Sequence, residues 1–88
     1  MTPIPTPSPE AEQEGRRTFA AELRRRRELL GWSQDRLGRS AGIDRQSVNR
    51  AERGATGPSV DRVYAYARAL GCEPGDLLPP IRRGQSDG

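Results

Sequence analysis

Glycine follows each of the first four stretches of this chain that have the apolar spacing of a helix, and this regular interruption limits the fold to several short helices. The four positions are Gly31, Gly42, Gly54 and Gly71. Glycine is common where a helix ends because it adopts a left-handed backbone without steric cost. We expect helices over residues 16–30, 33–40, 44–53 and 59–70, with N-caps at Ser33, Asp44 and Ser59, and a last helical turn over 74–78. Apolar residues at helical spacing predict the inward sides of the first and fourth helices, which are Phe19, Leu23 and Leu30 on the first and Val60, Val63, Tyr64, Ala67 and Leu70 on the fourth. The sequence therefore predicts an all-α domain.

Size and composition leave room for one small core. The chain has 88 residues, 32% of them hydrophobic, and a mean hydropathy of -0.90. A chain like this supports one domain with a thin apolar centre and no enclosed active site. It contains no histidine, and we find no nucleophile beside a base, no cluster with metal-ligand spacing and no phosphate-binding glycine loop. We expect no enzyme activity, no catalytic residue, no metal and no cofactor.

Positive charge is concentrated in the middle of the chain. Residues 1–15 contain three glutamates and no basic residue, whereas residues 16–83 contain all 15 arginines and eight acidic residues. A basic segment is typical of nucleic-acid-binding domains, although solvated helical domains without such a partner share it.

Proline-containing segments flank the predicted domain. Residues 1–9 have proline at every second position from Pro3 to Pro9, and residues 79–88 begin with two prolines. Because proline removes a backbone donor and interrupts helices, we expect a disordered, acidic tail over 1–15, the helical domain over 16–78 and a flexible tail over 79–88. We interpret the first tail as solvated, with docking to a proline-reading partner as the alternative. With neither a signal peptide nor a membrane-spanning run, a cytoplasmic protein without membrane contact is expected.

Residues 34–53 have the composition of two short helices packed through a tight turn. Gly38 permits the helices to approach closely, and Gly42 stands in the turn. Five apolar residues can form the contact between them: Leu37, Ala41, Ile43, Val48 and Ala51.

The second of these helices, over residues 44–53, separates two kinds of side chain. At about 100° per residue, Val48, Ala51 and Glu52 share one side. The opposite side carries only arginine and amide side chains, which are Arg45, Gln46, Asn49, Arg50 and Arg53. Arginine pairs with guanine O6 and N7, and the amides pair with adenine N6 and N7. The pattern favours a helix that reads the DNA major groove over the alternative, an ordinary solvated face.

From Leu23 to Leu78 the chain resembles the lambda-repressor-like helix-turn-helix family, also called the XRE family, which includes the phage Cro proteins. The matching segments are LGWSQDRLGRSAGI, VNRAERG and GPSVDRVYAYARALGCEPGDLL. The resemblance implies a compact five-helix domain that binds double-stranded DNA, as a homodimer on an inverted-repeat operator. It also implies a sequence-specific transcription regulator, acting as a repressor, that reads the major groove with residues 44–53.

The same resemblance implies roles for single residues. Four positions would read bases, with Asn49 the weakest of them: Arg45, Gln46, Asn49 and Arg50. Three positions would bind phosphate: Gln34, Arg53 and Thr56. Base contacts select the sequence, whereas phosphate contacts determine register on the duplex.

Glu52 falls on the inward side of its helix, where a carboxylate needs a partner. Helical spacing does not distinguish Arg26 from Arg27 as that partner; the resemblance selects Arg27 and implies a structural ion pair between Arg27 and Glu52. Trp32 is larger than the usual residue at its position and is interpreted as core, with a role at the edge near the DNA backbone as the alternative. Many similar proteins have alanine where Gly38 stands.

A protein-interaction module is the alternative function. The family also contains antitoxins and bridging factors, whose main role is to bind another protein. The proline-rich tail and the IRR segment at 81–83 are the features that would serve such a partner.

Overall fold

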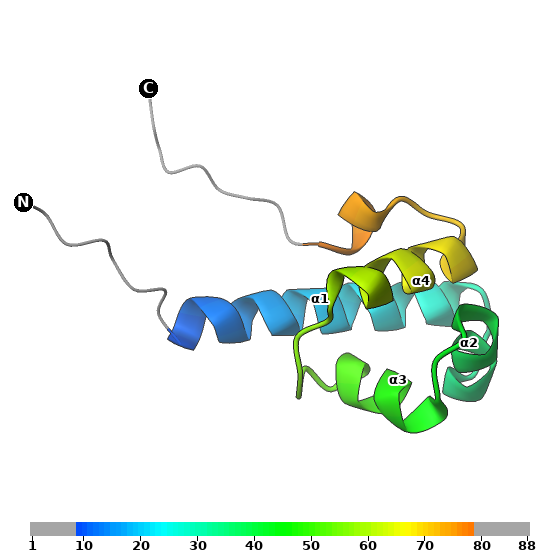
Figure 1. Cartoon of the computed structure of the whole chain (residues 1–88), viewed down its shortest axis with the longest axis horizontal. Coiled ribbons are helices and arrows are strands. Elements are labelled where there is room, and N and C mark those ends of the chain that lie inside the picture. Colours follow the sequence, from blue (N-terminus) through cyan, green and yellow to red (C-terminus); the bar gives the residue numbers. More distant parts are fainter. Residues whose placement is uncertain (1–8, 79–88) are drawn as a thin grey trace, which may run out of the picture.

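The computed structural model describes residues 9–78, which form four α-helices and one short 3-10 helix (Figure 1). These elements are α1 (Pro9–Leu29), α2 (Gln34–Ala41), α3 (Arg45–Glu52), α4 (Val60–Leu70) and the 3-10 helix η1 (Pro74–Leu77). The described residues contain no strand, so the expected all-α fold is confirmed. Across the same residues, no helix has both the length and the apolar character needed to cross a bilayer. Residues 1–8 and the tail at 79–88 lie outside this description.

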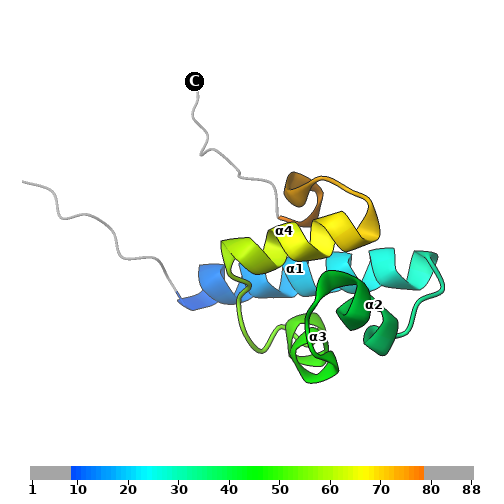
Figure 2. The ribbon, with the colours of Figure 1, turned by 45° about the vertical axis from the view of Figure 1, so that its right-hand side comes forward.

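The other elements pack against the C-terminal part of α1. In both views α4 runs alongside α1, while α2 and α3 lie together on one side of this pair (Figures 1 and 2). η1 contacts α4 and α1 on the side away from α3. The N-terminal end of α1 extends beyond the other helices.

The first helix starts earlier than the sequence analysis predicted. It begins at Pro9 rather than near Arg16, so residues 9–15, which we expected in a disordered tail, are helical. Proline is compatible with the first helical position, because its missing N–H would have no partner there. Glu10 and Glu12 follow in the first turn, where negative charge stabilises the helix dipole. The expectation applied the rule for proline inside a helix to a proline at a helix start.

The starts of the other three helices agree with the prediction, because each is capped by the expected side chain. Arg36 N donates to Ser33 Oγ at 3.0 Å, Ser47 N to Asp44 Oδ2 at 3.0 Å, and Arg62 N to Ser59 Oγ at 3.2 Å. Such caps satisfy backbone donors that have no partner within the helix. Gly42 and Gly71 then end α2 and α4 in the left-handed conformation, with φ of 72° and 74°.

One apolar cluster joins all five elements. Its buried members are Phe19, Leu23, Leu37, Val48, Ala51, Val63, Tyr66, Ala67 and Leu77. Ala41, Ile43 and Trp32 pack partly buried against it, so the predicted contact between α2 and α3 and the core position of Trp32 are both present.

Three residues that we predicted on apolar stripes are exposed instead. Leu30 follows the last residue of α1 and lies in the turn, so it no longer points along the inner side of that helix. On α4, Val60 and Tyr64 face solvent and the unpredicted Tyr66 is buried. The core-facing side of α4 therefore includes Tyr66 in place of Val60 and Tyr64. The Tyr66 ring packs against Phe19, with ring centroids 6.1 Å apart.

Candidate nucleic-acid interface

α2 and the turn that leads to α3 are held together by a close backbone contact between Gly38 and Ile43. A β-carbon at this position would overlap the Ile43 carbonyl oxygen, and Ile43 N donates to the Gly38 carbonyl oxygen at 2.8 Å. On α3, Val48 and Ala51 are buried against the rest of the core. Because these contacts occupy the inner side of α3, its opposite side is presented to solvent.

The solvent side of α3 and the start of α2 form a shallow hollow, which we call the reading surface. It is lined by Gln34, Arg45, Gln46, Asn49, Arg50 and Arg53. The fold therefore brings together the four base-reading candidates and two of the three phosphate candidates. Thr56, the third, lines a separate hollow that also includes Arg50.

Arginines of the reading surface and of α1 differ in their pairing, because four arginines of α1, Arg24 to Arg27, form ion pairs. Arg25 and Arg26 of α1 both pair with Glu22, at 2.6 and 2.8 Å, and the hydrogen bond from Arg25 lowers the pKa of the Glu22 carboxyl. Within residues 9–78, three arginines of the reading surface form no ion pair: Arg45, Arg50 and Arg53. These three positive charges lie together on one surface, where they favour a polyanionic ligand.

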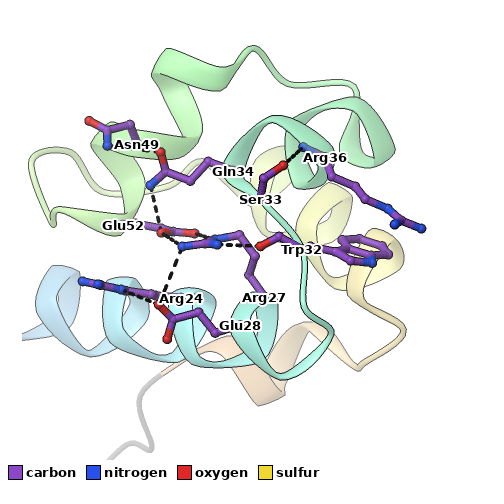
Figure 3. Close-up of polar contacts among 9 residues, drawn as sticks. All are labelled: Arg24, Arg27, Glu28, Trp32, Ser33, Gln34, Arg36, Asn49 and Glu52. Carbon is purple, nitrogen blue, oxygen red and sulfur yellow. Dashed lines mark hydrogen bonds and ion pairs between the residues drawn. The ribbon is translucent and has the colours of Figure 1, made fainter.

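A largely buried ion pair connects α1 to the inner side of α3 (Figure 3). Arg27 donates from Nε and Nη2 to the two carboxylate oxygens of Glu52, at 2.6 and 2.9 Å, and from Nη1 to the Trp32 carbonyl oxygen at 2.6 Å. The two side chains are only 11% and 3% exposed. The hydrogen bond to Glu52 raises the pKa of the Arg27 guanidinium above its usual value. Arg26, which helical spacing left as an alternative, contacts Glu22 instead.

Hydrogen bonds continue from this ion pair to the reading surface (Figure 3). Gln34 Nε2 donates to Glu52 Oε1 at 3.0 Å, Asn49 Nδ2 donates to Gln34 Oε1 at 3.3 Å, and Arg53 Nη1 donates to Asn49 Oδ1 at 3.4 Å. An ionised carboxylate can only accept, so Glu52 determines which end of the Gln34 amide faces it. Gln34 in turn determines the orientation of the Asn49 amide. We call this series of residues, from Arg27 to Arg53, the anchoring network.

The anchoring network distinguishes Asn49 from the other base-reading candidates. Asn49 is half-buried and both ends of its amide contact protein side chains, whereas Arg45, Gln46 and Arg50 are exposed. Gln34 also has both amide ends engaged, and its second N–H is left to reach a phosphate. Asn49 is therefore better suited to orient Arg53 than to read a base.

Trp32 closes the turn between α1 and α2. Its ring packs partly against the core, and the Arg36 guanidinium lies 4.8 Å from the ring centroid (Figure 3). A cation over an aromatic face is attracted by the ring electrons. The ring thus supports the turn whose carbonyl accepts from Arg27.

Sequence reasoning missed the bond between Gln34 and Glu52, and it did not single out Arg62 and Tyr66 beside Thr56. Helical periodicity assigns a residue to a face of its own helix and carries no information about which residues of other elements meet that face. In the sequence, Ser59 indicates where α4 begins, but it does not indicate which residues of other elements lie near Arg62.

Two short helices joined by a glycine turn, with arginine and amide side chains on the outer face of the second, define the helix-turn-helix class of DNA-binding domains. Residues 23–77, more than half of the chain, match the helix-turn-helix family, and the chain belongs to this family.

Three relatives extend this assignment. A hypothetical transcription factor of Neisseria meningitidis serogroup B is 37% identical over 73 residues, covering 82% of this chain and 69% of that protein. The restriction-modification controller protein C.AhdI from Aeromonas hydrophila is similar in structure, with 35% identity, a TM-score of 0.69, and coverage of 70% of this chain and 94% of that one. The P22 c2 repressor, solved in complex with a synthetic operator, has 32% identity and a TM-score of 0.65, covering 68% of this chain and 91% of its own. Together with the family assignment, these similarities show that the chain is a DNA-binding transcription regulator with a lambda-repressor-like fold.

Proposed function

We propose that this protein is a sequence-specific repressor that inserts α3 into the major groove of double-stranded DNA. The observation that carries the proposal is the reading surface, where six side chains suited to bases and phosphates line one hollow. Three of them are arginines that form no ion pair with any of residues 9–78. An α-helix fits the major groove, which is about 12 Å wide. Occupying an operator would block transcription without any chemical step.

The proposed roles follow the position of each side chain on this surface. Base edges are read by Arg45, Gln46 and Arg50, and Asn49 contributes mainly by orienting Arg53. Phosphate contacts are made by Gln34, Arg53 and Thr56. Gln34 stands at the start of α2, where unpaired backbone N–H groups and the helix dipole attract an anion.

We also propose that the protein binds DNA as a homodimer. An apolar hollow lies between the start of α1, the start of α4 and η1, and Val60, Tyr64 and Leu78 are exposed around it. Large exposed apolar patches mark contact surfaces. Glu12 and Arg16 also line this hollow, so a two-fold arrangement can set Glu12 of one copy against Arg16 of the other. Such a dimer would place two α3 helices about 34 Å apart, matching half-sites one turn of DNA apart.

The antitoxin or bridging alternative is not favoured. The features that suggested it lie mostly in residues 1–8 and 81–83, outside the described residues. Because the proposed ligand is genomic DNA, the proposal includes the cytoplasmic location expected from the sequence.

Selection of bound sites from a random pool of duplexes, at a stated salt concentration, tests the proposal. We expect enrichment of one inverted repeat, with a preference at each half-site and a spacing of about one helical turn. Addition of that site should shift the backbone amide signals of residues 45–53. Weak association that is uniform across sequences and abolished by salt would contradict sequence-specific recognition.

A further inference from the structure

The hydroxyl group of Tyr66 is buried beside Arg62. Its side chain is 1% exposed, and its hydroxyl makes no hydrogen bond of good geometry within residues 9–78. Burial raises the pKa of the phenol, whereas the charge of Arg62 and the contact of its guanidinium with the hydroxyl oppose this rise, so the hydroxyl stays protonated and can donate at neutral pH. A buried hydroxyl that makes no hydrogen bond destabilises the fold, which indicates that another group completes its bonding.

A small hollow lies beside this hydroxyl, between the edge of α3, the loop after it and α4. It is lined by Ser47, Arg50, Ala51, Thr56, Arg62 and Tyr66. No carboxylate is among these lining residues, and Arg50 and Arg62 form no ion pair with any residue from 9 to 78. The Ser47 hydroxyl already donates to Asp44 at 2.7 Å. The donors left for a ligand are two guanidinium groups and the hydroxyls of Thr56 and Tyr66, which is a set that binds an oxyanion.

The hollow borders the reading surface, because Arg50 lines both. At about 100° per residue, Ser47 and Asn49 lie on opposite flanks of the outer side of α3. One flank therefore faces the start of α2, with Gln34 beside Asn49, and the other faces α4 and the loop that leads to it (Figure 1). A helix in the major groove has a phosphate backbone on each side, and the hollow occupies the second side.

We propose that this hollow binds a phosphate of the DNA backbone, with Arg62 and Thr56 at its rim and the Tyr66 hydroxyl at its floor. The inference rests on the proposed function and adds to it two residues, Arg62 and Tyr66, from outside the helix-turn-helix itself. Through this contact, Tyr66 would link the apolar core of the protein to the phosphate backbone of the DNA.

The test compares three variants of the full chain: Arg62→Ala, Tyr66→Phe and, as the control, Arg68→Ala. Arg68 lies on the same helix, is exposed and is outside the hollow, so it matches the change in net charge. Dissociation constants are measured at several salt concentrations for the selected duplex and for a scrambled one. We expect Arg62→Ala to weaken binding about tenfold and to reduce the slope of log affinity against log salt by about 0.9. Tyr66→Phe should weaken binding about threefold with an unchanged slope, and Arg68→Ala should stay within about twofold.

The scrambled duplex separates this inference from the proposed function. A phosphate contact is independent of sequence, so the losses should appear on both duplexes. Wild-type protein that prefers no sequence would contradict the proposed function, while the effect of Arg62→Ala on the scrambled duplex would still support the hollow. If Arg62→Ala and Tyr66→Phe both behave like Arg68→Ala, the hollow binds no backbone phosphate.

Titration with inorganic phosphate distinguishes a free anion from the DNA backbone. Amide signals of residues 56 and 62 are followed by NMR in wild-type protein and in Arg62→Ala. A phosphate-dependent shift that Arg62→Ala abolishes, together with reduced DNA affinity, supports the assignment. The same shift with unchanged DNA affinity would assign the hollow to a free anion and overturn the proposed role in DNA binding.

Discussion

At the scale of single residues, arginines with a carboxylate partner and arginines without one have different functions. Arg27 is largely buried and pairs with Glu52, whereas Arg25 and Arg26 share Glu22 on the surface of α1. Arg45 and Arg50 have the same side chain and form no ion pair within residues 9–78. A guanidinium that is already paired adds less to the field around the protein, so the unpaired ones contribute more to the attraction of DNA.

Substitution of Arg50 and Arg53 separates reading a base from binding the backbone. Arg50→Ala should weaken binding by about 1 to 3 kcal/mol at one base position and relax the preference there. Arg53→Ala should weaken binding to all duplexes alike and lower the salt slope by about 1. Affinity for a panel of single-base variants, measured at several salt concentrations, checks both results. Identical effects of the two substitutions on specific and random duplexes would remove the assigned roles.

Removal of the Glu52 carboxylate tests the anchoring network. Glu52→Ala leaves the largely buried Arg27 guanidinium unpaired, so the free energy of unfolding should fall by about 3 kcal/mol. Urea denaturation followed by circular dichroism measures this change. Asp35→Ala is the control, because the ion pair between Asp35 and Arg39 is exposed and should contribute little. Unfolding of Glu52→Ala at the same urea concentration as the wild type would show that the pair adds no stability.

At the scale of secondary-structure elements, α2 and α3 pack together, and the backbone of the turn between them touches α2. Gly42 ends α2 in the left-handed conformation, and Gly38 allows the carbonyl of Ile43 to lie against α2. Val48 then enters the core beside Leu37. The orientation of the reading surface depends on this close approach.

A methyl group at Gly38 should therefore destabilise the protein even though alanine favours helices. Gly38→Ala places a β-carbon against the Ile43 carbonyl oxygen, and overpacking of this kind costs about 1 to 3 kcal/mol. Gly15→Ala is the matched control: Gly15 also lies within a helix, but nothing stands within 4 Å of an added β-carbon. We expect Gly15→Ala to stabilise the protein by about 1 kcal/mol. Thermal melting checks the opposite signs, and a gain in both variants would refute the close contact.

At the scale of the whole molecule, two surfaces have different chemistry. The reading surface carries arginines that form no ion pair in the described part of the chain. Val60, Tyr64 and Leu78 leave an exposed apolar patch on the hollow between α1, α4 and η1. A repressor that binds an inverted repeat needs both kinds of surface, one for DNA and one for a second copy.

A charge placed in the apolar patch should prevent dimer formation without unfolding the chain. Tyr64 is 61% exposed, so Tyr64→Glu should leave the circular dichroism spectrum unchanged. Sedimentation of the variant with the inverted-repeat duplex should show protomers that bind the two half-sites independently, one protomer to each. Leu29→Glu is the control, because Leu29 is also a large hydrophobic residue, is 72% exposed and lies outside the patch. A dimer that survives Tyr64→Glu would place the interface elsewhere.

The sequence by itself determined the features that depend on neighbours along the chain. The caps at Ser33, Asp44 and Ser59, the left-handed glycine at Gly42 and the two faces of α3 all follow from hydrogen bonds and side-chain positions within about four residues. The start of α1 at Pro9 is local as well, and was missed because proline was treated as a helix breaker at the one position where it is tolerated.

Only the tertiary structure decided which side chains meet between helices. Arg27 reaches Glu52 across 25 residues of sequence and Gln34 reaches it across 18, and no helical period relates positions on different helices. The burial of Tyr66 and the exposure of Val60 and Tyr64 likewise depend on how α4 is rotated against α1. That rotation is determined by how the side chains of several helices fill one common space.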